Sequence, residues 1–181
     1  MTRKNGDWTI KKTRQIFKND FLKVIEDEVI QPDGKKSTFA IVEFTKGSAV
    51  LPVDDEEFIY LTRQFRYALE REDLEVAAGT IEGQTPLETA RRETREELGI
   101  EAEEWTEFGK IEENTSITKS FINLYLARKL TFNKPEPEAT EKIKVVKMSL
   151  NDAVKKVMNG EITHDLTCIL ILKTHLFLKG Y

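Results

Sequence analysis

The sequence predicts an α+β protein with a mixed sheet, an N-terminal β-hairpin element and helices in two zones. Most apolar segments are short, and Pro, Gly and Asp turn signals bound them, as is typical of strands. One helix with clear start and stop signals is expected at residues 85–98, and two more are expected after residue 149. The 181 residues, 39% of them apolar, are enough for one sizeable hydrophobic core.

The first two strands are predicted at residues 21–30 and 38–44. Both segments alternate in polarity or run apolar, and Pro32, Asp33 and Gly34 lie between them. These three residue types favour a turn, so the two segments are expected to pair as a hairpin.

The later strands follow the same signals. Residues 49–53 and 58–62 flank Asp54, Asp55 and Glu56, which predicts a second hairpin. Further strands are predicted at residues 74–78, 105–112, 121–128 and 143–148. Helices are expected at 150–158, where Ser149 can act as the N-cap, and at 166–177.

The helix at residues 85–98 has the strongest local signals. Thr85 can cap it, Pro86 suits the first turn, and Glu88 completes a Thr-x-x-Glu capping box. Gly99 stands where a left-handed residue usually ends a helix. The apolar side is formed at spacings of three and four by Leu87, Ala90, Thr94 and Leu98.

Three carboxylates share another face of this helix. A turn of about 100° per residue brings Glu93, Glu96 and Glu97 together. Like charges at this spacing repel by a few tenths of a kcal/mol per pair, roughly, unless a cation neutralises them. Hard oxygen ligands suit Mg²⁺ or Mn²⁺, so we expect a divalent metal site. The alternative is a solvated acidic face with Glu–Arg pairs.

Residues 79–100, GTIEGQTPLETARRETREELGI, resemble the box of the Nudix family. The second half of that box, Arg-Glu-U-x-Glu-Glu-x-Gly-U with U a bulky apolar residue, matches Arg92 to Ile100, although Thr94 is a weak U. The first half departs twice. The loop from Gly79 is one residue short, and Gln84 replaces the glutamate that mostly holds the box arginine, here Arg92.

Further motifs resemble the branch of ADP-ribose pyrophosphatases and related ADP-sugar enzymes. These are Arg63-Gln64-Phe65-Arg66 and the Glu75-Val76-Ala77-Ala78-Gly79 segment, and the resemblance covers roughly residues 8 to 178. It implies a Nudix-type α/β/α sandwich with a mixed sheet. It also implies two regions, an N-terminal β-strand region at 1–45 and a Nudix hydrolase domain at 46–181.

The resemblance also implies roles for particular residues. The main-chain carbonyl of Ala78, with Glu93, Glu96 and Glu97, would bind the metal. The implied catalytic residues are Glu96, Glu141 and Arg92, and the implied substrate contacts are Arg66, Arg63, Phe21 and Phe39. Ordinary roles remain open: Phe21 and Phe39 could be core residues, Arg66 a surface arginine, and Glu141 part of a charged loop.

The implied reaction is Mg²⁺- or Mn²⁺-dependent hydrolysis of a nucleoside diphosphate linked to another moiety. ADP-ribose would give AMP and ribose 5-phosphate. Two alternatives are a Nudix enzyme for a GDP-sugar, a UDP-sugar or NADH, and a Nudix-fold nucleotide-binding module with weak catalysis.

Composition excludes several other classes of protein. The net charge of −4, without a long basic run, argues against nucleic-acid binding. The start of the sequence has no apolar signal core, and no apolar stretch is long enough to span a bilayer. Cys168 is the single cysteine, so no internal disulfide can form, and a cytoplasmic location is expected.

A homodimer is also expected from the N-terminal hairpin. Its apolar residues fall on both faces, and an isolated hairpin is marginal in water. A two-fold related copy is the commonest cover for the second face, and a monomer with the hairpin tucked onto its own sheet is the alternative. The apolar positions are Leu22, Val24, Ile25, Val29, Ile30, Ala40, Ile41 and Val42.

Overall fold

The computed structural model describes residues 2–136 and 142–181, which form two compact units. The N-terminal unit comprises the chain up to Lys46 together with Glu112–Phe121. The main unit comprises Gly47–Ile111 and Ile122–Tyr181.

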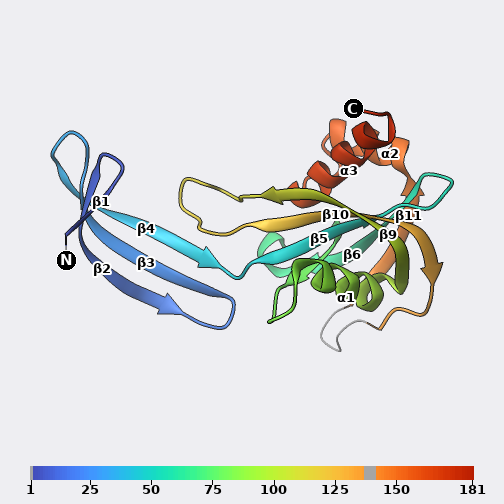
Figure 1. Cartoon of the computed structure of the whole chain (residues 1–181), viewed down its shortest axis with the longest axis horizontal. Helices are drawn as coiled ribbons and strands as arrows, with labels where there is room; N and C mark the ends of the chain where they lie inside the picture. The colour runs from blue at the N-terminus through green and yellow to red at the C-terminus, as the bar shows by residue number, and fades with distance from the viewer. Residues whose placement is uncertain (1, 137–141) are drawn as a thin grey trace. The chain divides into compact units, whose positions relative to one another are not determined.

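The N-terminal unit contains a four-stranded antiparallel sheet in the order β1-β2-β3-β4 (Figure 1, blue). Its strands are β1 (Arg3–Asn5), β2 (Trp8–Lys18), β3 (Leu22–Ile30) and β4 (Lys36–Phe44). The predicted hairpin is therefore confirmed as β3 and β4. The first two strands were missed because β2 is exposed from Lys11 onward, so its sequence lacks the alternation of a half-buried strand.

A segment from later in the chain completes the N-terminal unit. The Val42 N–H donates to the Ile117 carbonyl at 2.9 Å, and the Lys119 N–H donates to the Val42 carbonyl at 2.9 Å. These two bonds attach the segment Glu112–Phe121 to the free edge of β4, which explains why residues so distant in sequence belong to one unit.

The main unit has two sheets. One has the order β8-β5-β10-β9 and the other β11-β6-β7, and β5 with β10 is the parallel pair that makes the first sheet mixed. The strands are β5 (Gly47–Pro52), β6 (Phe58–Arg66), β7 (Arg71–Glu75), β8 (Ala77–Thr80), β9 (Ile100–Ile111), β10 (Ile122–Phe132) and β11 (Lys144–Ser149). A short 3₁₀ turn, Tyr67–Leu69, follows β6.

The predicted hairpin of residues 49–53 with 58–62 is wrong, although the turn between them exists. Strands β5 and β6 lie in different sheets and share a single bridge, Val53 with Ile59. Both edges of β5 are already hydrogen-bonded, to β8 and to β10, so β6 has no edge of β5 to pair with. The predicted strand at 74–78 divides in the same way into β7 and β8.

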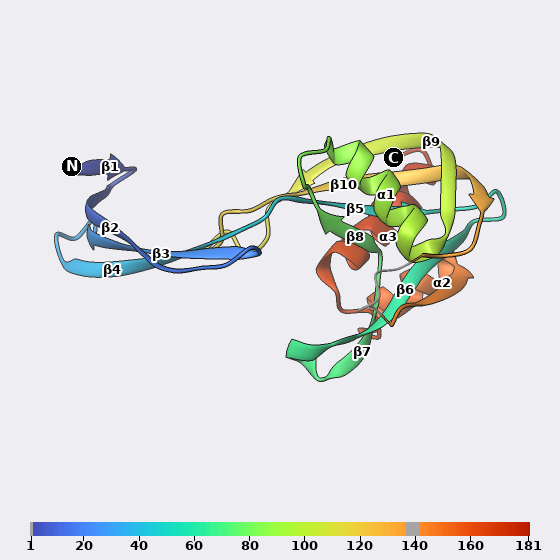
Figure 2. The same ribbon diagram turned by 90° about the horizontal axis from the view of Figure 1, so that it is seen from below.

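Helices cover both faces of the β8-β5-β10-β9 sheet, as Figures 1 and 2 show. Side chains alternate along the strands, so Val50 and Tyr125 pack with Ala90 and Leu98 of α1 (Pro86–Leu98). On the opposite face, the core contains residues of α2 (Leu150–Met158) and α3 (Asp165–Leu178) together with Ala49, Leu51, Leu124 and Leu126. The predicted α/β/α sandwich is confirmed.

The ends of α1 are those that the sequence predicts. The Thr85 side chain accepts from the Glu88 N–H, and Glu88 accepts in return from the Thr85 N–H. Gly99 ends the helix with φ of 66°, in the left-handed region. In α2, the Ser149 hydroxyl caps the helix by accepting from the Asp152 N–H.

Candidate active site

The helix α1 brings its acidic residues to one arginine. Arg92 Nη2 lies 2.6 Å from Glu93 Oε1, and Arg92 Nη1 lies 2.9 Å from Glu96 Oε2. Burial disfavours the charge on Arg92, but the carboxylates of Glu93 and Glu96 outweigh it and raise the pKa of the guanidinium. Arg92 therefore stays charged and holds the two glutamates in place.

The carboxylates are unusually buried for glutamates. Glu93 is 8% exposed and Glu97 is 5% exposed. Acidic side chains are rarely buried unless they are paired or bind a cation. Glu93 also lies against β8, because its Oε1 atom would be 1.7 Å from a Cβ atom built on Gly79. Ala78 precedes this glycine on β8, opposite Ala49.

The shortened loop keeps its predicted contact with the helix. Arg92 Nε donates to Gln84 Oε1 at 3.4 Å, and Arg92 Nη2 donates to the Thr80 carbonyl at 3.4 Å. The expectation that Gln84 faces Arg92 is confirmed. The bond is long and joins the arginine to a neutral amide, so it is weaker than the ion pair that a glutamate would form.

The donor atoms of this site suit a hard divalent cation. The carboxylates of Glu93, Glu96 and Glu97 lie on adjacent turns of one helix, and that of Glu93 reaches the Gly79 position of β8. Within residues 2–136 and 142–181, no three Asp, Glu, His or Cys side chains converge on a single point in the way that a metal requires. Glu93 and Glu96 are instead turned to Arg92.

A second charged cluster lies at the start of the 3₁₀ turn. Arg66 Nε donates to Glu75 Oε1 at 2.6 Å, and its Nη2 donates to Glu75 Oε2, so the pair is bidentate. Glu75 is 3% exposed, while the Arg66 side chain is 44% exposed. The buried carboxylate thus orients an arginine that remains accessible to a ligand.

His164 belongs to the same cluster, and the sequence analysis missed it. Its Nε2 atom lies 3.7 Å from Glu75 Oε2, and its Nδ1 atom lies 2.8 Å from Thr167 Oγ1. The signal that could have found it is its position just before α3, although its side chain makes no capping hydrogen bond to this helix. Nothing in the local sequence indicates that this end of the helix meets β7.

The other predicted site residues lie in different places. Arg63 is exposed on β6, opposite Leu74 of β7 and Lys144 of β11. Phe21 and Phe39 belong to the N-terminal unit. Phe21 is 69% exposed, so it is no core residue, whereas Phe39 meets the Trp8 ring edge-on at 5.8 Å. Glu141 lies outside the described residues.

Comparisons with known proteins agree with this fold and site. The NUDIX domain family matches residues 44–165, and the family described as the nucleoside diphosphate sugar hydrolase N-terminal domain matches residues 8–42. The chain therefore belongs to the Nudix family, and its main unit is that of a Nudix hydrolase.

Two curated relatives and one solved structure illustrate the likeness. The ADP-ribose pyrophosphatase of Bacillus subtilis (strain 168) is 34% identical over 151 residues, which cover 82% of each chain. The methanol dehydrogenase activator of Bacillus methanolicus is 29% identical over 163 residues, 88% of each chain. A crystal structure of an ADP compounds hydrolase superposes with a TM-score of 0.84 at 20% identity, covering 98% of this chain and 97% of that one.

Nudix hydrolases generally use divalent metal ions, in agreement with the carboxylates on α1. A membrane-spanning helix is not found in the described part of the chain, where every helix is too short or too polar to cross a bilayer.

Proposed function

We propose that the protein hydrolyses ADP-ribose to AMP and ribose 5-phosphate with Mg²⁺, or Mn²⁺, as the cofactor. The observation that carries the proposal is the burial of the Glu93 and Glu97 carboxylates on the box helix, with Glu93 against Gly79 of β8. The name of the Bacillus subtilis relative supports the choice of substrate.

The metal would be held by the Ala78 carbonyl, Glu93, Glu96 and Glu97. A bound divalent ion supplies charge neutralisation at the phosphate oxygens and lowers the pKa of a water. Arg92 holds Glu93 and Glu96 in position, as its contacts of 2.6 and 2.9 Å indicate. Its own role is thus to position the carboxylates.

The proton of the attacking water needs a carboxylate acceptor. Glu96 suits this role because its side chain is 29% exposed, so it is the more accessible of the two glutamates that Arg92 holds. Glu141 is the second candidate, by resemblance to the family.

The substrate would be held at both ends. Arg66, oriented by Glu75, would bind a phosphate with its planar guanidinium, and the exposed Arg63 on the same strand would add charge. Phe21 or Phe39 of the second chain of the proposed homodimer would stack on the base, which is worth about 1–3 kcal/mol per base in other nucleotide-binding proteins.

A phosphatase-coupled assay tests the proposal. ADP-ribose, ADP-glucose, GDP-mannose, UDP-glucose and NADH are incubated with Mg²⁺ or with EDTA, and the phosphate released from the products is measured. We expect ADP-ribose to be hydrolysed best, only with metal, and not by Glu97→Gln. Preference for another diphosphate would identify the alternative Nudix substrates, and no hydrolysis of any of them would favour the binding module.

We also propose the homodimer, formed through the N-terminal strand region. On one face of this sheet Phe17 and Val24 are register partners, as are Leu22 and Phe44. Phe17 is 51% exposed and Phe44 is 43% exposed, so this face presents apolar side chains to its surroundings. Sedimentation at low micromolar concentration checks it, since a single species near 20.9 kDa would exclude the dimer.

The single cysteine supports our proposal of a reducing compartment such as the cytoplasm. Cys168 itself is no candidate nucleophile, because burial raises the pKa of its thiol.

A further inference from the structure

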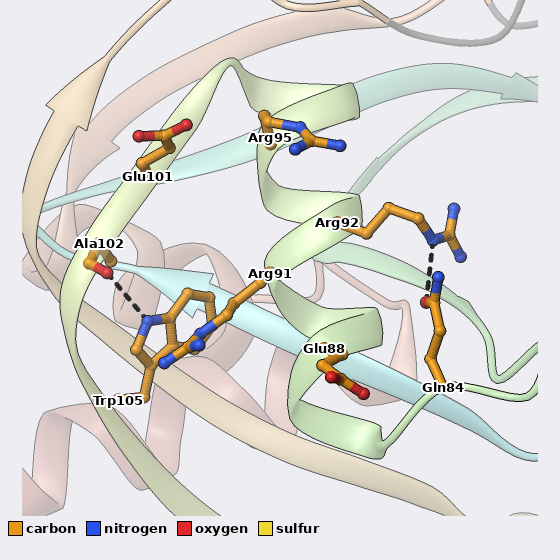
Figure 3. Close-up of a pocket in the computed structure, with 8 residues that line it drawn as sticks. All are labelled: Gln84, Glu88, Arg91, Arg92, Arg95, Glu101, Ala102 and Trp105. Atoms are coloured by element: carbon orange, nitrogen blue, oxygen red, sulfur yellow. Dashed lines mark hydrogen bonds between the residues drawn. The ribbon is translucent and has the colours of Figure 1, made fainter.

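A cavity of about 510 Å³ lies between α1 and the start of β9, in the main unit. Volumes of about 300–1,000 Å³ are typical of sites that bind small ligands. Figure 3 shows the side chains that line it, and most of them are charged or can donate hydrogen bonds. The proposed catalytic steps do not use Arg91, Arg95 or Trp105, which line this cavity.

Three arginines of one helix reach this cavity. Arg91 and Arg95 are one turn apart and exposed, and Arg92 lies between them in sequence. The Arg95 side chain is 60% exposed, and its Nη2 atom is 3.9 Å from the nearest oxygen of Glu96. Guanidinium groups bring five N–H donors each and suit the oxygens of a phosphate.

The arginines of the cavity differ in how they are paired. Arg92 is paired with Glu93 and Glu96, so Arg91 and Arg95 supply the positive charge of the cavity, beside the carboxylates of Glu88 and Glu101. Glu88 is engaged in the helix cap, where it accepts from the Thr85 N–H at 2.8 Å. The guanidinium donors of Arg91 and Arg95 can therefore turn to an anionic ligand.

An aromatic surface adjoins the arginines. The Arg91 guanidinium lies 5.6 Å from the centre of the Trp105 ring, and Figure 3 shows the two side chains next to each other. Trp105 Nε1 donates to the Ala102 carbonyl at 3.0 Å, which fixes the ring in place. A fixed aromatic ring beside arginines is the combination on which nucleotide bases stack.

We propose that this cavity is a binding site for a nucleoside monophosphate, separate from the hydrolytic site. Arg95 binds the phosphate, and the base stacks on the Arg91 guanidinium, which lies over the Trp105 ring. Gln84 adds an amide at the loop side of the cavity, where it accepts from Arg92. Arg92 and Gln84 also belong to the hydrolytic site, but Arg91, Arg95 and Trp105 take no part in the proposed catalytic steps, so the proposal does not depend on the proposed substrate.

The test uses Trp105 as its reporter, since the chain has only two tryptophans. The Trp8→Phe variant of the full chain leaves Trp105 as the sole source of indole fluorescence and of the indole N–H resonance. AMP is titrated in EDTA, so that metal-dependent binding at the hydrolytic site is absent. We expect a saturable change in both signals, and weaker effects from adenosine and from inorganic phosphate.

Variants locate the binding. In Arg91→Gln with Arg95→Gln, AMP should bind about tenfold or more weakly, because charge-assisted hydrogen bonds are lost. Lys18→Gln with Lys179→Gln removes the same charge from exposed positions elsewhere and should leave the affinity unchanged. Glu97→Gln should also leave it unchanged, which separates this site from the hydrolytic one.

Four results would overturn the proposal. These are no saturable effect of AMP, unchanged affinity in the double arginine variant, loss of binding in Glu97→Gln, and equal binding of AMP and inorganic phosphate. Should circular dichroism show that the double variant does not fold, Arg95→Gln alone replaces it, because Arg95 is mostly exposed and the Arg91–Trp105 contact stays intact. Unchanged affinity in that variant would equally overturn it.

Discussion

The Glu93 carboxylate fills the space beside Gly79, where a Cβ atom would lie 1.7 Å from Glu93 Oε1 and 2.2 Å from Glu93 Cδ. Gly79 is not among the residues with positive φ, so its backbone conformation does not require glycine. The absence of a side chain is what matters, because it lets the helix carboxylate approach the β8 backbone. The Nudix box glycine on β8 thus makes room for a glutamate fourteen positions later, on α1.

We predict that Gly79→Ala displaces Glu93 and lowers kcat about 100-fold, because misplacing a catalytic group by about 1 Å can have an effect of that size. Gly83→Ala, in the loop that follows β8, is the control. No atom lies within 4 Å of a Cβ there, although its φ of +78° makes alanine cost about 1–2 kcal/mol of stability. Steady-state kinetics with thermal melts of both variants distinguish the two effects. Equal kcat in the two variants would contradict the prediction.

We expect Glu97→Gln to abolish metal-dependent hydrolysis while the protein stays folded. The change removes a carboxylate that would bind the metal and also reduces repulsion with Glu93, one turn away, by a few tenths of a kcal/mol, roughly. Activity is compared with and without EDTA, and the melting temperature should be equal to or above that of the parent. Full activity of this variant would contradict the assignment of Glu97 as a metal ligand.

Gln84→Glu should raise kcat or leave it unchanged. Arg92 Nε, which donates to Gln84 Oε1 at 3.4 Å, would then donate to a carboxylate. Charge assistance roughly doubles the strength of such a hydrogen bond. Kinetics of the single change and of the same change with one residue inserted after Gly83 measure the effect. A large loss in the paired variant would show that the short loop has a geometry of its own.

Arg66→Ala should raise KM strongly for every diphosphate substrate. It should also destabilise the protein, because the buried Glu75 loses its bidentate partner. Arg66→Lys separates the two effects, since it keeps the charge and loses the planar fork. We expect its KM to rise about tenfold, as for a lost charge-assisted hydrogen bond, with a smaller change in stability. An unchanged KM would leave Arg66 with a structural role alone.

Asp54 should stabilise the fold at neutral pH and lose this effect in acid. Burial alone would raise the pKa of its carboxyl, but Lys147, the Phe58 N–H and the Tyr60 hydroxyl outweigh burial and lower it. A lowered pKa in the folded state gives stability that is present above the ordinary value of 3.8 and is lost as the pH falls through the folded value.

The substitution that measures this is Asp54→Asn. It should cost about 1–3 kcal/mol at pH 7, and the difference from the parent should shrink toward pH 3. Urea unfolding over this pH range gives the values. Asp55→Asn is the control, because the Asp55 side chain is 86% exposed and should show almost no effect. A cost that is independent of pH would contradict the prediction.

The sequence by itself determined the helices and the chemistry of the box. The ends of α1 follow from Thr85, Glu88 and Gly99, and each signal acts within about four residues of the groups that it satisfies. The same local geometry places Glu93, Glu96 and Glu97 on adjacent turns. The β3–β4 hairpin was also predictable, because its partners are joined by a short turn.

Only the tertiary structure decided which strands pair and which side chains meet. The edges of β5 are taken by β8 and by β10, which begins more than sixty residues later, so β6 joins another sheet. Tertiary structure also brings Arg66 and His164 to Glu75, and it places Arg91 over the Trp105 ring. Their contacts depend on remote segments competing for edges and buried faces. Which segments pair depends on the packing of the whole chain, so the local sequence does not predict it.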